Sequence, residues 1–259
     1  MPDVSLIDCG NGFWSLRGPL KIKGLINIGT QASLIEAPDG TFVWLDCAPL
    51  SDEAEQQVTA LTDNGAKVAA VLNLHPFHTL YCQDFYQRFP KAQFFGSTRH
   101  KQKCPDIAWQ ADLVESDAVA QRFAGLLEFS LPRGVDYISA NENVHFSSLM
   151  AYHPASQTVH SDDTLNFFAD RFPINLLPGI AGVNFHMTLA KALQKRCGAA
   201  QDFRDWAGEM ADHWAGARRL CAAHKGMTEF ASGGFAHEVT AALQRVEPVL
   251  ARHESEYGQ

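Results

Sequence analysis

The segment VHFSSLMAYHPASQTVHSDDTLNFF, residues 144–168, carries the most informative pattern in the chain. Its apolar residues come in short runs that are typical of β-strands. His145 lies on the first of these predicted strands, and the acidic residue Asp163 follows the next one. In layered folds, chemistry collects where strands end and loops begin. The segment therefore predicts part of a sheet together with part of a functional site.

The residues before this segment predict alternating strands and helices. Residues 25–47 indicate a strand pair around Pro38-Asp39-Gly40, where proline presets the turn and glycine can adopt a positive φ. Acidic residues after Ser51 and the glycine at position 65 mark the two ends of a helix. The elements predicted next are a buried strand over 68–74, a helix near 80–89 and a short strand over 92–96. This alternation indicates a layered α/β architecture.

The later part of the chain changes character. A helix near 115–124 precedes several short strands, VDYISA at 135–140 among them, whose spacing indicates an antiparallel meander. Apolar residues spaced three and four apart predict helices over 201–223 and 235–250. Because no Pro/Gly-rich linker interrupts the chain, we expect one domain over residues 1–259.

Composition and charge limit the classes of function. The chain has 259 residues and a formal net charge of −8, and an acidic surface disfavours general binding to nucleic acid. No apolar stretch approaches the roughly 20 residues of a membrane helix. The six cysteines form no C-x-x-C pair, which is typical of reduced thiols. We therefore expect a cytoplasmic protein with a small-molecule substrate and neither a nucleic-acid nor a membrane partner.

An apolar stripe in the C-terminal third bears on oligomeric state. The stripe consists of Phe203, Trp206, Met210 and Trp214, spaced three or four residues apart. A stripe of this width is what a helix needs to pack on a sheet, so a core role is favoured over a dimer surface. A homodimer is left open.

Four of the eleven histidines stand out by their position. His75 and His78 follow the buried strand over 68–74, His145 lies in the segment 144–168, and His224 precedes a glycine in CAAHKGM. Four others are predicted to lie on the surface without a function: His100, His153, His213 and His253.

Imidazole nitrogens together with a bridging carboxylate form a good site for Zn²⁺, or for iron or manganese. Asp163 is the candidate carboxylate, and its neighbour Asp162 is the alternative. The competing interpretation involves no metal: His75 and His78 cap a helix that begins near Leu80, and His145 is a half-buried strand residue.

The order of these segments resembles the metallo-β-lactamase fold of metallo-hydrolases. That family combines a strand and D-x-G turn with T-H-x-H-x-D-H, G-H-T-x-G-S, T-G-D-T-L and a final G-H-G. This chain offers VWLDCAP at 43–49, VLNLHPFHT at 71–79, the segment 144–168 and CAAHKGM at 221–227. The resemblance implies a four-layered αββα sandwich. The chain also looks like a divergent, uncharacterised branch of that superfamily, the DUF4336 type.

The resemblance implies a metal-ligand set and two departures from it. The implied ligands are His75, His78, His145, Asp163 and His224. Asp46 matches the aspartate that supports the ligand loop. Asn73 falls at the first histidine of the motif, and Phe77 falls at its aspartate. Because each half of a two-metal site loses one ligand, we expect one zinc ion in preference to two.

Three functions follow from this pattern. The first is a metal-dependent hydrolase in which metal-bound hydroxide attacks an ester, thioester, lactone or amide carbonyl, with Asp163 and His78 as the catalytic residues. The second is a non-catalytic protein that binds a small molecule or a partner on a degenerate hydrolase fold. The third is an iron redox protein, which the shortage of carboxylates disfavours.

Overall fold

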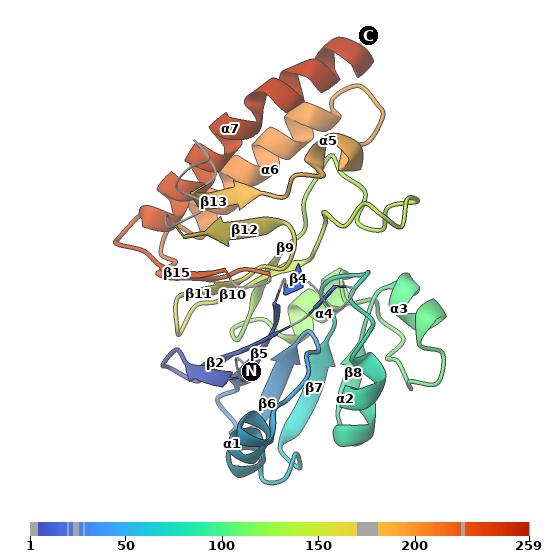
Figure 1. The fold of residues 1–259 in the computed structure, drawn as a ribbon, viewed down its shortest axis with the longest axis vertical. Coiled ribbons are helices and arrows are strands. Elements are labelled where there is room, and N and C mark those ends of the chain that lie inside the picture. Colours follow the sequence, from blue (N-terminus) through green and yellow to red (C-terminus); the bar gives the residue numbers. More distant parts are fainter. Residues whose placement is uncertain are drawn as a thin grey trace. The chain divides into compact units, whose positions relative to one another are not determined.

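The computed structural model describes residues 5–19, 21–22, 26–27, 29–169, 181–223 and 226–258. The chain folds into two compact units. The first unit comprises Met1–Glu128 and His153–Ser156, and the second comprises Phe129–Tyr152 and Gln157–Gln259. Each unit has its own sheet (Figure 1). Each unit also has its own hydrophobic core. The expectation of one domain over 1–259 stays a prediction.

The first unit contains a six-stranded sheet in the order β1-β2-β5-β6-β7-β8. Its strands are β1 (Ser5–Asp8), β2 (Phe13–Gly18), β5 (Thr30–Glu36), β6 (Phe42–Leu45), β7 (Val68–Leu72) and β8 (Gln93–Phe95). A separate two-stranded ribbon consists of β3 (Lys21–Ile22) and β4 (Ile26–Asn27). The pairs up to β6 are antiparallel, whereas β6, β7 and β8 run parallel. The carboxyl ends of these three strands therefore meet at one edge of the sheet.

Four helices connect or follow the strands of the first unit. They are α1 (Asp52–Thr62), α2 (Cys82–Arg88), α3 (Thr98–Lys103) and α4 (Asp117–Arg122). The predicted start of α1 is confirmed, because the Ser51 hydroxyl accepts a hydrogen bond from the Ala54 amide at 3.1 Å. Trp44 of β6 packs edge-on against Phe85 of α2, with ring centroids 5.3 Å apart. These contacts bury one face of the sheet beneath α1 and α2.

The second unit contains a five-stranded sheet in the order β15-β14-β11-β10-β9. Its strands are β9 (Glu128–Ser130), β10 (Met150–His153), β11 (Thr158–His160), β14 (Arg219–Cys221) and β15 (Met227–Glu229). β11 pairs in parallel with β14, and β14 pairs antiparallel with β15. A further antiparallel pair joins β12 (Leu165–Phe168) to β13 (Gly182–Phe185).

The helices of the second unit are α5 (Leu189–Ala192), α6 (Ala199–His213) and α7 (Gly234–Tyr257). The apolar stripe of α6 is buried in the core, as predicted: Phe203, Trp206, Met210 and Trp214 are at most 4% exposed. Phe203 contacts Phe146, with ring centroids 5.9 Å apart, and Trp214 contacts Tyr152 at 5.7 Å. The α6 helix and its C-cap residue therefore pack against both the sheet and the loop that precedes β10.

Three predictions about local structure are wrong. The helix expected over 201–223 ends at His213, and Arg219–Cys221 instead form β14, whose backbone pairs with strands on both sides. Residues 135–140 are not a strand, since only Val135 forms an isolated bridge, with Leu193. His145 lies in the loop before β10 and not on a strand.

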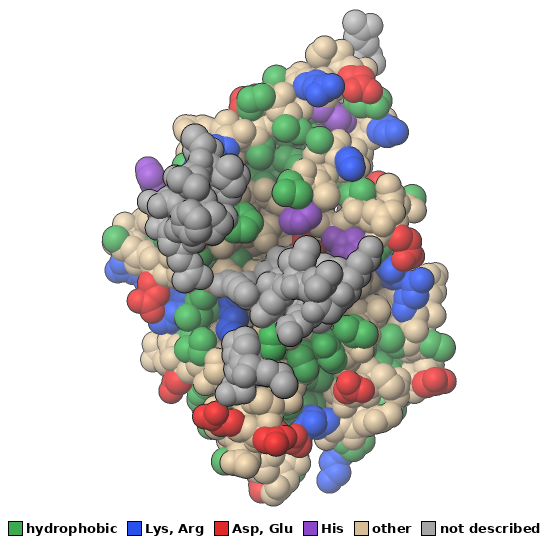
Figure 2. Space-filling view, in the orientation of Figure 1, with side chains coloured by type: hydrophobic (Ala, Val, Ile, Leu, Met, Phe, Trp, Pro, Cys, Tyr) green, Lys and Arg blue, Asp and Glu red, His purple; other side chains and the backbone are tan. Residues whose placement is uncertain are grey.

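Two further features concern the distribution of charge on the surface and the length and hydropathy of the helices. Acidic and basic side chains are both spread over the face that Figure 2 shows. Among the described residues, no helix is both long enough and apolar enough to cross a membrane.

Candidate metal centre

Asp46 organises the loop that carries the first two histidines. It directly follows β6, it is 3% exposed, and its backbone adopts a left-handed φ of 58°. Its Oδ1 accepts hydrogen bonds from the Leu74 amide at 2.7 Å and from the His75 amide at 3.3 Å. Because β6 and β7 are parallel neighbours, the carboxylate reaches across the sheet edge to the loop after β7. This is the supporting role that the sequence resemblance implied for Asp46.

His75 and His78 lie together in this loop. Their rings stack with centroids 3.9 Å apart and an interplanar angle of 17°. One candidate ligand nitrogen of each lies within 4.8 Å of the other. His75 is fully buried, and its Nδ1 accepts a hydrogen bond from the Phe77 amide at 3.2 Å. For His75 to bind a metal through Nε2, its proton must move to Nδ1, so the Phe77 amide would have to give up this bond.

Asn73 has a structural role in place of a ligand role. Its side-chain Oδ1 accepts hydrogen bonds from the thiols of Cys47 and Cys82, each at 3.2 Å. Its Nδ2 donates to the Phe95 carbonyl at 3.1 Å. The buried amide therefore joins the segments after β6 and β7 to the end of β8 and to the start of α2. A metal could take Oδ1 only at the cost of these thiol contacts.

Phe77, which the sequence resemblance aligned with a metal-binding aspartate, is an aromatic ring with a cation above it. Phe77 is 9% exposed, and Cζ of Arg99 lies 4.4 Å from the centre of its ring. This is within the range of a cation–π interaction. The loop consequently presents an apolar ring and a positive charge where a metal-binding carboxylate would carry a negative one.

His100 is a buried residue that sequence reasoning wrongly placed on the surface. It is 0% exposed, and burial lowers its pKa to about 3. Its Nδ1 accepts a hydrogen bond from the Ser97 amide at 3.1 Å, and the Ser97 side chain accepts one from the His100 amide, which forms a capping box at the start of α3. Nδ1 also lies 2.9 Å from the Ser97 hydroxyl. The spacing of Ser97 and His100 is the signal that could have identified it.

His153 and His253 were also predicted on the surface and are also buried, at 2% and 8% exposure. Burial lowers the pKa of His153 to about 4. Each ring has a hydrogen-bond partner, which explains how the imidazole is tolerated inside: the Ser156 hydroxyl for His153 and the Gln194 carbonyl for His253.

In the second unit, Asp162 and Asp163 follow β11 and are 4% and 3% exposed. The turn that contains them is fixed by Thr164, whose Oγ1 accepts a hydrogen bond from the Ser148 amide at 2.9 Å. Asn166 donates from Nδ2 to the Asp163 carbonyl at 3.1 Å. The Asp163 turn is thereby tied to the loop that carries His145.

His145 is half-buried in that loop. Its Nε2 lies 2.8 Å from the Glu142 carbonyl, and its own carbonyl accepts from the Thr188 hydroxyl at 3.4 Å. A ring nitrogen of His145 and a carboxylate oxygen of Asp163 lie within 4.8 Å of each other. Because Nε2 donates to a carbonyl in this arrangement, Nδ1 is the nitrogen that can offer a lone pair to a metal.

Side chains of the kinds that could hold a metal ion thus occur in both units. They are His75 and His78 in the first unit and His145, Asp162 and Asp163 in the second. His224, the remaining ligand that the resemblance implied, lies outside the described residues. Imidazole nitrogen and carboxylate oxygen are donors that fit zinc, and they also suit iron and manganese.

Comparison with solved structures shows the fold. A metallo-β-lactamase from Erythrobacter litoralis has a TM-score of 0.60 and 14% identity, over 96% of this chain and 97% of that chain. FIM-1 from Pseudomonas aeruginosa, in its mono-zinc form, has a TM-score of 0.61 and 10% identity, over 94% and 96%. A metallo-β-lactamase from Pontibacter korlensis has a TM-score of 0.56 and 11% identity, over 96% and 99%. The chain has the mixed α/β fold of the metallo-β-lactamases, as the sequence resemblance implied.

Comparison of the sequence with family models and with curated proteins gives no match. The DUF4336-like branch stays a prediction.

Proposed function

We propose that this chain is a metal-dependent hydrolase that acts on an ester, thioester, lactone or amide bond of a small molecule. The observation that carries the proposal is the survival of two donor pairs, His75 with His78 and His145 with Asp163. Within each pair, the candidate ligand atoms lie within 4.8 Å of each other. Both pairs are built into loops by buried hydrogen bonds.

We propose that one metal ion is bound, zinc in preference to iron or manganese. The five residues that would hold it are His75, His78, His145, Asp163 and His224. Three protein ligands and a water suffice for an open catalytic zinc site, so this set exceeds the minimum for one ion. The set has too few ligands for two ions, because Asn73 already accepts hydrogen bonds from two thiols and Phe77 has no atom that could bind a metal.

Bound zinc supplies a Lewis acid and lowers the pKa of a coordinated water to about 7. The protein side chains supply the rest. Asp163 and His78 are the proposed catalytic residues: beyond holding the ion, a carboxylate oxygen of Asp163 would be available to take up a proton, and the His78 imidazole would help to orient the substrate. Phe77 keeps one side of the site apolar, and the positive charge of the Arg99 guanidinium above its ring attracts an anionic oxygen of the substrate.

Elemental analysis of protein purified without chelators or a histidine tag tests the proposal. We expect about one ion per chain, and we expect His145→Ala/Asp163→Ala to lose it. His237→Ala, which removes an exposed histidine of α7, is the matched control and should keep the ion. A positive result justifies a screen of esters, thioesters, lactones and amides with the wild-type chain and the double variant.

The second candidate function is a binding protein that has lost hydrolysis. The observation that favours it is the replacement of two ligand positions by Asn73 and Phe77, both of which have their own packing roles. Protein that contains no metal and takes up none when Zn²⁺ is added would contradict the hydrolase proposal and leave this alternative. The cytoplasmic location, the small-molecule substrate and a homodimer are predictions that this experiment does not address.

A further inference from the structure

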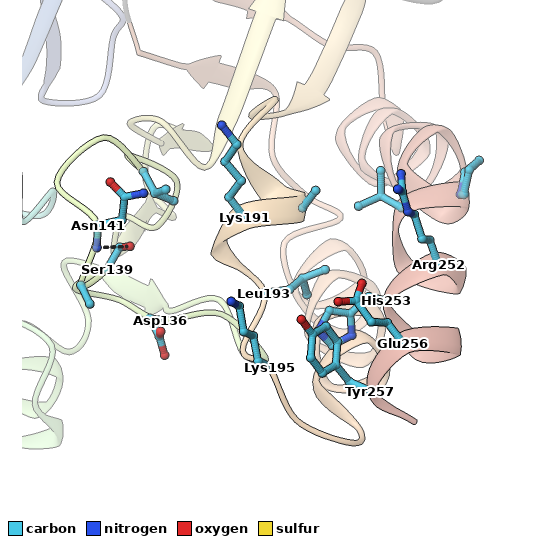
Figure 3. Close-up of a pocket in the computed structure, with 15 residues that line it drawn as sticks. Asp136, Ser139, Asn141, Lys191, Leu193, Lys195, Arg252, His253, Glu256 and Tyr257 are labelled. Carbon is cyan, nitrogen blue, oxygen red and sulfur yellow. Dashed lines mark hydrogen bonds between the residues drawn. The ribbon is translucent and has the colours of Figure 1, made fainter. Parts of the chain in front are cut away.

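A large pocket lies in the second unit, and its lining contains none of the proposed metal ligands. Its volume is about 990 Å³, at the upper end of the range for small-molecule sites. Three segments line it: the loop that includes Asp136 and Asn141, the residues from Ala190 to Lys195, and the C-terminal end of α7 (Figure 3).

Gln194 holds these three segments together. Its side-chain Nε2 donates to Oδ1 of Asp136 at 3.0 Å, and its amide donates to the Gly134 carbonyl at 2.9 Å. Its carbonyl lies 2.9 Å from Nε2 of the buried His253 on α7. Hydrogen bonds within the protein therefore join the three segments that line the pocket.

Charge in the pocket favours an anion. Lys191, Lys195 and Arg252 line it, and within the described ranges their side chains form neither an ion pair nor a hydrogen bond. Two acidic residues, Asp136 and Glu256, also line the pocket, so its three basic side chains outnumber the acidic ones. In the view of Figure 3, Lys195 lies between Asp136 on one side and Glu256 and Tyr257 on the other.

The rest of the lining is apolar. Val144, Leu193, Pro248 and Val249 contribute aliphatic surface. The Tyr257 ring packs on His253, with centroids 4.8 Å apart, and adds an aromatic face. A ligand that buries hydrocarbon here gains about 25 cal/mol for each Å² removed from water, whereas a purely ionic ligand would leave this surface wet.

We propose that this pocket binds a small organic anion with an apolar body, such as a medium-chain carboxylic acid. The carboxylate is held by Lys195 and Arg252, with Lys191 contributing to the local positive potential. The hydrocarbon lies against Val144, Leu193 and Val249. The inference is independent of the proposed hydrolase activity, because it uses no metal and no catalytic residue.

Calorimetric titration of the full chain with octanoate tests the proposal. Octanamide, which has the same body without the charge, and acetate, which has the charge without the body, are the matched probes. We expect octanoate to bind at least about tenfold more tightly than either, because each probe removes one of the two sources of affinity.

Charge reversal in the pocket lining separates this site from general binding to the surface. Lys195→Glu and Arg252→Glu should each weaken octanoate binding about tenfold. Lys67→Glu makes the same change at an exposed lysine of the first unit and should leave the affinity unaltered. Far-ultraviolet circular dichroism verifies that each variant is folded, and Lys195→Met provides a neutral second variant with an intermediate effect.

Three outcomes would overturn the proposal. They are the absence of octanoate binding to the wild type, equal binding of octanamide, and unaltered binding in both charge-reversal variants. Loss of octanoate affinity in Lys195→Glu and Arg252→Glu, with retention in Lys67→Glu, supports it.

Discussion

At the scale of single residues, the Asp46 carboxylate determines whether the histidine loop keeps its shape. Asp46→Ala would leave the buried amides of Leu74 and His75 without their acceptor, and it would place alanine at a positive φ. An unsatisfied buried amide costs about 1–3 kcal/mol, so we expect a loss of about 3 kcal/mol in the free energy of unfolding. Urea denaturation measures the loss.

Asp46→Asn is the matched control for this prediction. Asparagine keeps an acceptor oxygen at the same position and tolerates a left-handed backbone, so the expected loss is only about 1 kcal/mol. Equal destabilisation by alanine and asparagine would contradict the role assigned to the two hydrogen bonds. It would indicate that the negative charge itself is what the loop requires.

Phe77 and Arg99 allow a second residue-scale prediction. Phe77→Asp introduces the carboxylate that the family motif has, but the nearby Arg99 guanidinium would pair with it. We therefore expect the metal content to stay near one ion per chain in Phe77→Asp and to rise only in Phe77→Asp/Arg99→Ala. Elemental analysis of the two variants, with Arg99→Ala alone as the control, measures this difference.

A rise in the single variant would show that Arg99 does not compete for the new carboxylate. The sequence identified Phe77 as a departure from the motif, because that required only the spacing of VLNLHPFHT. It could not identify Arg99 as the partner. The two residues are 22 positions apart and meet only because β7 and β8 are parallel neighbours whose following segments share an edge.

At the scale of elements, His100 couples the start of α3 to pH. Its pKa is about 3 in the folded chain, lowered chiefly by burial, against an ordinary value of 6.5. Above pH 6.5 the ring is neutral in both states and contributes no pH dependence. As the pH falls from 6.5 towards 3, the unfolded chain takes up a proton that the folded chain does not. The free energy of unfolding should then fall by about 1.4 kcal/mol per pH unit.

His100→Gln tests this coupling while keeping the cap. Glutamine at this position can still accept a hydrogen bond from the Ser97 amide, as in a usual capping box, but it does not titrate. We expect the variant to lose less stability than the wild type between pH 7 and pH 5, as measured by urea denaturation at both values. If the free energy of unfolding falls equally in both proteins between pH 7 and pH 5, the titration of His100 is not the cause of the fall.

Gly134 fixes the approach of α6 to the preceding loop. A Cβ at this position would lie 2.0 Å from the Ala199 carbonyl oxygen, and φ is +73°. Gly125 has a similar φ of +85° with nothing within 4 Å, so it is the matched control. We expect Gly125→Ala to cost about 1 kcal/mol for the backbone conformation alone, and Gly134→Ala to cost clearly more. Thermal unfolding compares the two, and equal losses would show that the loop simply moves aside.

Elements whose conformation is determined by their local sequence could be predicted. Elements whose conformation depends on pairing or packing with other parts of the chain could not. The start of α1 follows from Ser51 and the acidic turn after it, and periodicity identified α6 and α7, although it extended α6 ten residues too far. The residues of β14 show a helical spacing, yet they form a strand because β11 and β15 supply backbone partners on both sides. His100 was misplaced for the same reason, since its burial depends on tertiary packing that periodicity does not encode.

At the scale of the whole molecule, the chain shares a fold with proteins whose sequences differ from it at most positions. The solved structures share only 9–15% identity with this chain and still cover 93–96% of it. The prediction of the fold therefore rested on the order of segments along the chain and not on the identity of individual residues. The same low identity means that fold alone does not assign the chemistry, and the donor atoms must do so.

Zinc should stabilise the whole chain if the proposed ligands bind it, because a ligand that binds only the folded state adds RT ln(1 + [L]/Kd) to the free energy of unfolding. At a free zinc concentration of about 100 times Kd this amounts to about 2.7 kcal/mol, or roughly 5–10 °C in the melting temperature of a chain of this size. Calorimetric scans in a zinc buffer and in excess EDTA measure the difference.

The dependence on zinc concentration separates specific binding from general effects of the ion. Each tenfold increase in free zinc above Kd should add about 1.4 kcal/mol in the wild type and nothing in His145→Ala/Asp163→Ala. An equal shift in both proteins would mean that zinc binds elsewhere, for example at the thiols of Cys47 and Cys82, and a Cys47→Ser/Cys82→Ser variant would then lose it. A shift in the wild type alone would show that His145 or Asp163 binds the metal in the folded chain, the condition that hydrolysis at this site requires.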